Sequence, residues 1–321
     1  MMKPLIIITG PTAVGKTALS IRLAKAVGGE IISADSMQVY RHMDIGSAKI
    51  TKEEMEGVPH YLINVLDPDE EFNVTVFQKM AKEAVEEIYS HGHIPIVTGG
   101  TGFYIQSLLY DIDFTEDGGD TSLRRELEKL GQERGVSFLH SLLKDIDPDS
   151  AAEIHENNMK RVIRAIEYYR QTGEQISEHN KREKQKKSPY DFLFYVVNTD
   201  RALLYERIDR RVDLMVEQGL VEEVMHLKDM GLSRDMVSMQ GLGYKEILDY
   251  LQGIYSLEEA VYVLKRDTRH FAKRQITWFK RERDVRWLNL PDFNHDLDQV
   301  LLKILQDIYE MYGLENNKPW K

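Results

Sequence analysis

An apolar run that ends in a glycine-rich loop constrains this chain more than any other feature. Residues 5–9 (LIIIT) are apolar and mostly β-branched, which predicts a buried parallel strand. Residues 10–17 (GPTAVGKT) match the P-loop pattern completely, and residues 16–27 carry apolar side chains at helical spacing. A strand, this loop and a helix in that order predict a cradle for the phosphates of a polyphosphate ligand.

Each part of the loop has a physical role in holding phosphate. Its glycines allow backbone N–H groups to point at phosphate oxygens, and the helix N-terminus adds partial positive charge. Lys16 adds a full charge, and the Thr17 hydroxyl is placed to contact a Mg²⁺ ion. The predicted phosphate-binding residues are Gly10, Pro11, Thr12, Ala13, Val14, Gly15, Lys16 and Thr17.

Strand and helix patterns then alternate along most of the chain. Further strands are predicted at 30–35, 60–67, 94–100 and 192–199, with a helix at 73–92 and one or two helices at 200–231. This alternation indicates an α/β fold with a P-loop NTPase-like, doubly wound parallel sheet.

The middle of the chain has a different pattern. A polar hinge at 114–122 is followed only by helical patterns, and then by a basic segment at 179–189 that we interpret as a linker. We therefore expect an inserted all-helical domain at 114–189. The α/β core is expected at 1–113 and 190–321, with further helices at its C-terminal end.

Charge is unevenly distributed over the 321 residues. The net charge is −11, yet residues 160–187 hold nine Lys and Arg against four Glu, and residues 265–286 hold nine against three acids. These segments are either solvated helix surfaces or basic faces that bind a polyanion such as a nucleic acid. The absence of cysteine excludes disulfides, thiolate zinc sites and a cysteine nucleophile. No signal-peptide or membrane-spanning pattern is present, so we expect a cytoplasmic protein without a membrane partner.

Three more patterns are candidates for the site, two where strands of the sheet are expected to end and one on a helix. Asp35 follows the second strand and is a Mg²⁺ ligand of the Walker-B kind, a general base or a helix cap. Thr101 follows Gly99-Gly100 at a helix start, which is either a second anion-binding terminus or an ordinary capped turn. Arg207 and Arg211 share a helix face and contact either phosphate or neighbouring acids.

Read together and in order, these blocks resemble the bacterial tRNA dimethylallyltransferases. The resemblance covers residues 5 to about 288 and includes GPTAVGKT, DSMQVYRHMDIGSAK (35–49), HYLINVLDPDEEFNV (60–74), GGTGFY (99–104), NNMKRVIRAIE (157–167) and MQGLGYKE (239–246). Generic P-loop kinases lack the DSMQ block. Eukaryotic relatives carry a C-terminal zinc finger, which this cysteine-free chain cannot form.

The resemblance implies a reaction and roles for residues. A dimethylallyl group passes from dimethylallyl diphosphate to the exocyclic N6 amine of the adenosine 3′ to the anticodon, in tRNAs that read U-starting codons. Asp35 is implied as the base, with Lys16, Thr101, Arg211 and Mg²⁺ on the leaving diphosphate. The implied tRNA contacts are Asp35, Ser36, Met37, Gln38, Thr101, Arg124, Lys160, Arg161, Val162, Ile163, Arg164, Gln240, Gly241, Leu242, Gly243, Tyr244 and Lys245. The family often has Arg where this chain has Gln240.

Three other functions use the same phosphate cradle. A small-molecule or nucleotide kinase accounts for residues 10–17 and Asp35, but not for the basic insertion or the DSMQ block. An adenylate isopentenyltransferase, which prenylates free nucleotides, needs no basic RNA-binding face. A GTPase-like switch would need a base-specificity motif, which we do not find. We therefore expect tRNA, through its anticodon stem-loop, and dimethylallyl diphosphate as the partners, with no obligate protein partner.

Overall fold

The computed structural model describes residues 3–114 and 122–313, and its contacts divide the chain into two compact units. One unit runs through Leu109 and resumes at Ser188, and the other is Tyr110–Lys187. We expected these boundaries at 114 and 190, within a few residues of those observed. Most of the predicted hinge, residues 115–121, lies outside the described residues. No helix of the described part is both long and apolar enough to cross a membrane.

A parallel sheet forms the centre of the first unit. Its strands are β1 (Pro4–Thr9), β2 (Gly29–Ala34), β3 (His60–Tyr61), β4 (Ile94–Gly99), β5 (Asp191–Asn198) and β6 (Val285–Asn289). They lie in the order β3-β2-β4-β1-β5-β6, and every pairing is parallel. Strand β1 is buried throughout and lies between β4 and β5. The carboxyl ends of β1, β2 and β4 therefore lie side by side at one edge of the sheet, and each leads into a predicted site loop.

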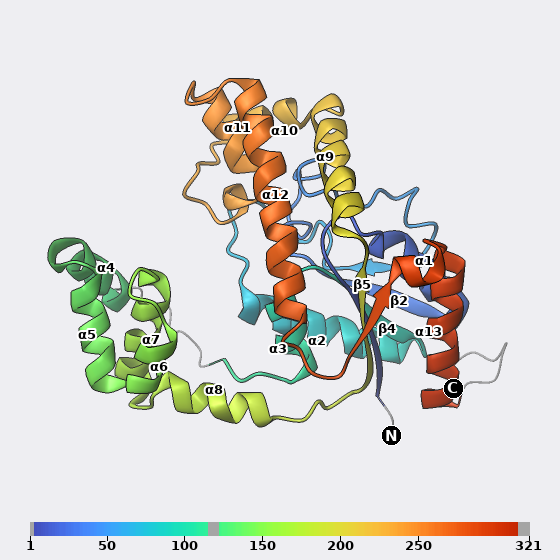
Figure 1. Cartoon of the computed structure of the whole chain (residues 1–321), viewed down its shortest axis with the longest axis horizontal. Coiled ribbons are helices and arrows are strands. Elements are labelled where there is room, and N and C mark those ends of the chain that lie inside the picture. Colours follow the sequence, from blue (N-terminus) through green and yellow to red (C-terminus); the bar gives the residue numbers. More distant parts are fainter. Residues whose placement is uncertain (1–2, 115–121, 314–321) are drawn as a thin grey trace. The chain divides into compact units, whose positions relative to one another are not determined.

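Helices cover both faces of this sheet, which makes the fold doubly wound as predicted. Figure 1 shows α1 (Lys16–Val27) and α13 (Leu297–Tyr312) on one side, and α2 (Val74–Ser90) and α3 (Gly102–Leu109) on the other. Four further helices pack as a group: α9 (Arg201–Glu217), α10 (Leu220–Asp229), α11 (Tyr244–Leu251) and α12 (Leu257–Phe279). Short 3₁₀ turns occur at Ser238–Gln240 and Leu290–Phe293.

Two strand predictions were wrong. The strand expected at 60–67 is only His60–Tyr61, because Leu62 and Asn64 adopt positive φ angles of 62° and 56° that no extended strand can accommodate. The edge strand β6 was missed, since its sequence, VRWLN, lies in a segment that we interpreted as helical.

The structure also settles the helices in two regions where the sequence pattern was ambiguous or misinterpreted. The region 200–231 forms two helices, α9 and α10, which are separated at Gly219, where φ is 103°. Most of the segment interpreted as a basic linker, 179–189, is helical instead, because α8 (Ile176–Gln185) extends through residue 185. Its Lys, Arg, Glu and Gln residues are good helix formers, and pairs such as Lys181–Glu178 offset the density of positive charge.

The second unit is helical throughout its described residues. It consists of α4 (Ser122–Arg134), α5 (Val136–Ile146), α6 (Pro148–Glu153), α7 (Met159–Thr172) and α8. A separate apolar core that includes Leu127, Leu139, Leu143 and Ile166 holds these helices together. The unit therefore has a core of its own, as an inserted domain requires.

Candidate active site

The loop after β1 has the geometry that phosphate binding requires. Gly10, Ala13 and Gly15 have positive φ angles of 143°, 63° and 106°, which turn the backbone around the loop. A Cβ on Gly10 would lie 2.2 Å from the Val197 carbonyl oxygen, so only glycine fits there. Helix α1 then begins at Lys16 with no side-chain cap, which leaves its first N–H groups available to an anion.

Two cations, Lys16 and Arg211, lie at this loop. Burial makes the charged form of each less favourable. The Lys16 Nζ donates to the Gly10 and Pro11 carbonyls at 3.0 and 2.8 Å. Arg211, from α9, lies 3.3 Å from the Thr12 hydroxyl. Burial and the nearby Arg211 charge lower the pKa of Lys16 to about 7, while Asp35 acts in the opposite direction. Burial likewise lowers the pKa of Arg211. A bound polyanion would offset the cost of burying these two positive charges, so the site favours binding of a diphosphate.

Asp35 lies directly after β2, and no helix follows it, so it is not a helix cap. Its Oδ1 accepts from the backbone N–H of Met37 at 2.8 Å and, weakly, from that of Gln38 at 3.4 Å. Oδ2 has no hydrogen-bond partner among the described residues, and the side chain lines a cavity. One carboxylate oxygen thus orients the group, and the other is available to take a proton.

The loop after β4 is joined to the P-loop by one glutamine. Gln275, from α12, accepts from the Thr12 N–H at 2.9 Å and donates to the Gly100 carbonyl at 3.0 Å. A Cβ on Gly100 would lie 2.1 Å from the Gln275 Nε2, so a side chain there would displace the glutamine and break this bridge. This bridge places Thr101, the first residue before α3, at the same cavity as Thr12.

These groups meet in a cavity of about 400 Å³ within the α/β unit. Thr12, Asp35, Thr101 and Arg211 provide its polar surface, together with Lys245 and Arg274. The sequence did not predict its apolar wall, because apolar residues at helical spacing are equally expected in a hydrophobic core. That wall is formed by Phe72, Tyr104, Ile208, Val212, Met215, Leu264 and Phe271. A cavity with an anionic-ligand end and an apolar wall suits an isoprenoid diphosphate.

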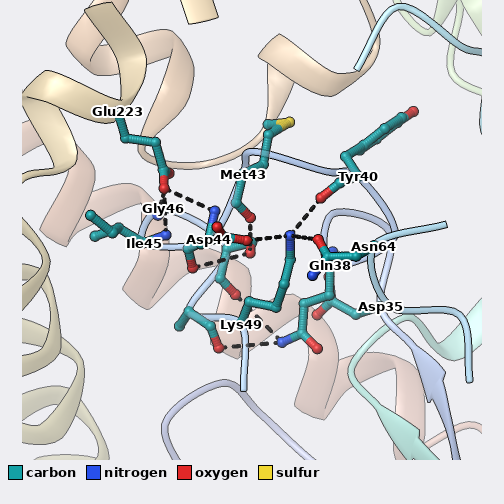
Figure 2. Close-up of polar contacts among 12 residues, drawn as sticks. Asp35, Gln38, Tyr40, Met43, Asp44, Ile45, Gly46, Lys49, Asn64 and Glu223 are labelled. Atoms are coloured by element: carbon teal, nitrogen blue, oxygen red, sulfur yellow. Dashed lines mark hydrogen bonds and ion pairs between the residues drawn. The ribbon is translucent and has the colours of Figure 1, made fainter. Parts of the chain in front are cut away.

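A buried lysine fixes the loop that carries Asp35. Figure 2 shows the Lys49 Nζ donating to the Tyr40 carbonyl, the Asp44 carboxylate and the Asn64 side-chain oxygen, at 2.5, 2.7 and 2.6 Å. Burial lowers the pKa of Lys49, and the hydrogen bond to Asp44 opposes this shift. Because a buried charge is costly unless it is fully paired, these three partners hold residues 40–49 in one conformation.

A glutamate from α10 holds the same loop from the other side. The Glu223 carboxylate accepts from the backbone N–H groups of residues 44, 45 and 46 at 2.9, 2.7 and 3.0 Å. It also accepts from the Tyr244 hydroxyl at 2.9 Å. Nothing in the sequence pattern singles out Glu223, since its partners are backbone groups far away along the chain.

Of the residues expected to contact the acceptor nucleotide, some line the cavity and others do not. Ser36, Met37, Gln240, Gly241, Leu242 and Lys245 line the cavity with Asp35 and Thr101. The Gln38 amide instead makes long contacts of 3.4–3.5 Å with the Ser33 hydroxyl and the carbonyls of residues 47 and 48. The Tyr244 ring is fully buried and packs against Gly46, so its side chain is a support rather than a contact. Gly243 is the N-cap residue of α11 and has a positive φ of 96°.

The residues of helix α7 that were expected to contact tRNA are also of two kinds, basic side chains at the surface and apolar side chains in the core. Lys160 and Arg161 are exposed, and Arg164 is half-buried with Glu167 3.7 Å away. Arg124 also pairs with Glu167, at 2.7 Å. Val162 and Ile163 are only 0% and 3% exposed and belong to the core of this unit, so their side chains cannot contact RNA. The basic side chains therefore form the surface that this helix offers to a polyanion.

The second basic segment is in part an ion-paired helix surface. In α12, Lys265, Arg266 and Arg269 pair with Asp213, Asp267 and Asp209. Asp209 therefore has a partner other than Arg211, which reaches the P-loop instead. Arg274 differs from these three cations in lining the cavity.

Comparison with known proteins supports the family resemblance that the sequence motifs indicated. A family model described as IPP transferase matches residues 38–282. Two curated relatives are named tRNA dimethylallyltransferase. The protein from Lachnoclostridium phytofermentans is 62% identical over 95% of this chain and 98% of its own. The protein from Alkaliphilus oremlandii is 52% identical over 94% and 97%.

Solved structures add the fold. A tRNA isopentenylpyrophosphate transferase from Bacillus halodurans is 45% identical and covers 97% of this chain and 98% of its own, with a TM-score of 0.73. A eukaryotic dimethylallyltransferase acting on tRNA is 31% identical and covers 99% and 82%, with a TM-score of 0.83. The P-loop, the DSMQ block and these matches agree, and the chain belongs to the IPP transferase family of tRNA dimethylallyltransferases.

Proposed function

We propose that this protein transfers the dimethylallyl group of dimethylallyl diphosphate to N6 of the adenosine 3′-adjacent to the anticodon, in tRNAs that read U-starting codons. The observation that carries the proposal is the single cavity that joins a P-loop, an aspartate and an apolar wall. A kinase needs no such wall beside its phosphates, and kinase activity is not favoured by the family.

The diphosphate end of the substrate would lie in the P-loop. The loop N–H groups, Lys16 and Arg211 stabilise the charge that grows on the bridging oxygen as the allylic C–O bond breaks. Thr101 lines the same cavity and would add a hydroxyl donor. The dimethylallyl chain then faces the apolar residues, which exclude water from the developing carbocation.

Magnesium fits the donor groups at this point. The Thr17 residue is exposed in the first turn of α1, and its hydroxyl makes no hydrogen bond within the described residues. Hydroxyl and phosphate oxygens are ligands that suit Mg²⁺. Thr17 would hold the ion, which neutralises charge on the leaving diphosphate.

The acceptor amine requires a base. The N6 lone pair attacks C1 of the allylic chain, diphosphate leaves, and the free Oδ2 of Asp35 takes one N6 proton. Because the amine is buried in a stacked anticodon loop, the adenosine must be flipped out into the cavity. Ser36, Met37 and residues 240–242 line the space that it would enter. The exposed cations of α7 would bind phosphates of the anticodon stem-loop in the cytoplasm.

Label transfer tests this proposal. The enzyme is incubated with labelled dimethylallyl diphosphate and either an anticodon stem-loop or free AMP, and separately with γ-labelled ATP. We expect the label of the isoprenoid in the stem-loop, with release of diphosphate and little transfer to AMP. Equal transfer to AMP would identify a free-nucleotide prenyltransferase, and phosphate transfer from ATP would identify a kinase.

A further inference from the structure

Two histidines and a glutamate meet at the end of the sheet away from the cavity. Glu30 is the second residue of β2, and His91 and His93 lie between α2 and β4. The two Nδ1 atoms lie 3.0 and 2.6 Å from the same carboxylate oxygen, Glu30 Oε1. Within the described residues, this is the group of three His, Asp or Glu side chains whose ligand atoms all lie within 4.8 Å of one another.

The carboxylate of this cluster is buried, whereas its two imidazole partners are partly exposed. The Glu30 side chain is 3% exposed, whereas those of His91 and His93 are 44% and 46% exposed. Its second oxygen, Oε2, accepts from the Tyr61 hydroxyl at 2.6 Å. Hydrogen bonds with Tyr61, His91 and His93 therefore hold a buried carboxylate in place beside two imidazole nitrogens.

We propose that Glu30, His91 and His93 bind one Zn²⁺ ion through Oε1 and the two Nδ1 atoms, with water at the fourth position. Zinc bonds of about 2.0–2.2 Å in a tetrahedron place ligand atoms roughly 3.3 Å apart. The present separations from Oε1, 3.0 and 2.6 Å, are shorter than this, so the half-exposed imidazoles must move outward to admit the ion. Tyr61 would orient the carboxylate from outside, as outer-shell partners of metal ligands do.

The ligand chemistry excludes magnesium. Two imidazoles and one carboxylate suit zinc, iron, copper or nickel, whereas Mg²⁺ takes oxygen ligands. The site is also separate from catalysis. Five residues of strand lead from Glu30 to Asp35, a span of about 16 Å at the usual strand rise. The bound ion would therefore connect the amino ends of β2 and β4 and leave the diphosphate cradle untouched.

Metal titration tests the site with full-length, tag-free protein that has been stripped by a chelator. Competition with a chromophoric chelator should show one Zn²⁺ per chain in the presence of excess Mg²⁺. His91→Gln and His93→Gln should each weaken binding by at least the roughly 10- to 100-fold that follows loss of an outer-shell partner. Tyr61→Phe keeps all three ligands and should weaken it within that range.

A matched control comes from a second pair of histidines. His42 and His226 have ring centroids 6.3 Å apart, and no carboxylate completes a three-ligand group there among the described residues. His226→Gln should bind Zn²⁺ as the unchanged protein does. The proposal is overturned if the stripped protein takes up no Zn²⁺, or if its affinity is unchanged by His91→Gln and His93→Gln in variants with native circular dichroism.

Discussion

Positively charged side chains occur both at the cavity of the α/β unit and on the surface of α7, but they differ in their exposure to water. At the P-loop, Lys16 and Arg211 are desolvated, and the Asp35 carboxylate acts on both of them, with Glu54 also acting on Arg211. On α7, Lys160 and Arg161 are exposed to water. Charges in a low-dielectric site act strongly and at short range, whereas exposed charges are screened by salt. The difference supports our proposal that the chemistry takes place in the cavity and that the helical unit positions the tRNA.

The largest effect should come from Asp35, the group that takes the proton. Asp35→Asn keeps an oxygen for the Met37 N–H but removes the base, so the single-turnover rate should fall by roughly two to four orders of magnitude. Diphosphate affinity and the salt dependence of tRNA binding should change little. Loss of diphosphate binding along with turnover would make Asp35 a metal ligand instead.

Arg211 should have the next largest effect, because its charge meets charge that grows in the transition state. Arg211→Ala should slow transfer by roughly 10²- to 10³-fold, as removal of one preorganised donor does, and should weaken inhibition by diphosphate. Arg210, its exposed neighbour on α9, provides the control. An equal loss in Arg210→Ala would show that the effect is not specific to the cavity.

Gln38 tests whether the loop at 35–38 also recognises the base. If its amide exchanges its long contacts for the adenine edge, Gln38→Ala should reduce discrimination against guanine by about 1–3 kcal/mol. Prenylation of stem-loops that differ only in adenosine or guanosine at the target position measures this. An unchanged preference would assign recognition to the residues that line the cavity.

A smaller effect should appear with pH. Since the pKa of Lys16 is about 7 without ligand, the lysine loses its proton as the pH rises above 7. A bound diphosphate favours the charged form, so binding above pH 7 takes up a proton. Affinity for diphosphate should then fall with rising pH by up to about tenfold per unit. Lys16→Gln removes this dependence, and calorimetry in buffers of different ionisation enthalpy counts the proton. An identical pH profile in both proteins would contradict the buried-lysine account.

The sequence predicted the parts of the site that are continuous in the chain. Strand β1, the P-loop and α1 were located from their pattern, as was Asp35 at the end of β2, because one local rule places each of them. Arg211 was a candidate, but whether it faced phosphate or acid depended on tertiary contacts.

What the sequence missed depends on residues far apart in the chain. Gln275 and Glu223 act on backbone groups more than 170 residues away, and no local pattern records such a partner. The short β3 follows from positive φ angles at Leu62 and Asn64, which are unusual for leucine. The helix α8 was mistaken for a linker because its charge was weighed above its helix propensity.

The salt dependence of tRNA binding, measured together with the single-turnover rate, tests the division of labour most directly. In Lys160→Ala/Arg161→Ala/Arg164→Ala, the slope of log affinity against log salt should flatten by about two to three units if each cation meets one phosphate. The rate with saturating tRNA should stay close to that of the unchanged enzyme, because these residues position rather than react. An unchanged slope, or a rate at saturation that falls as far as in Asp35→Asn, would contradict the account.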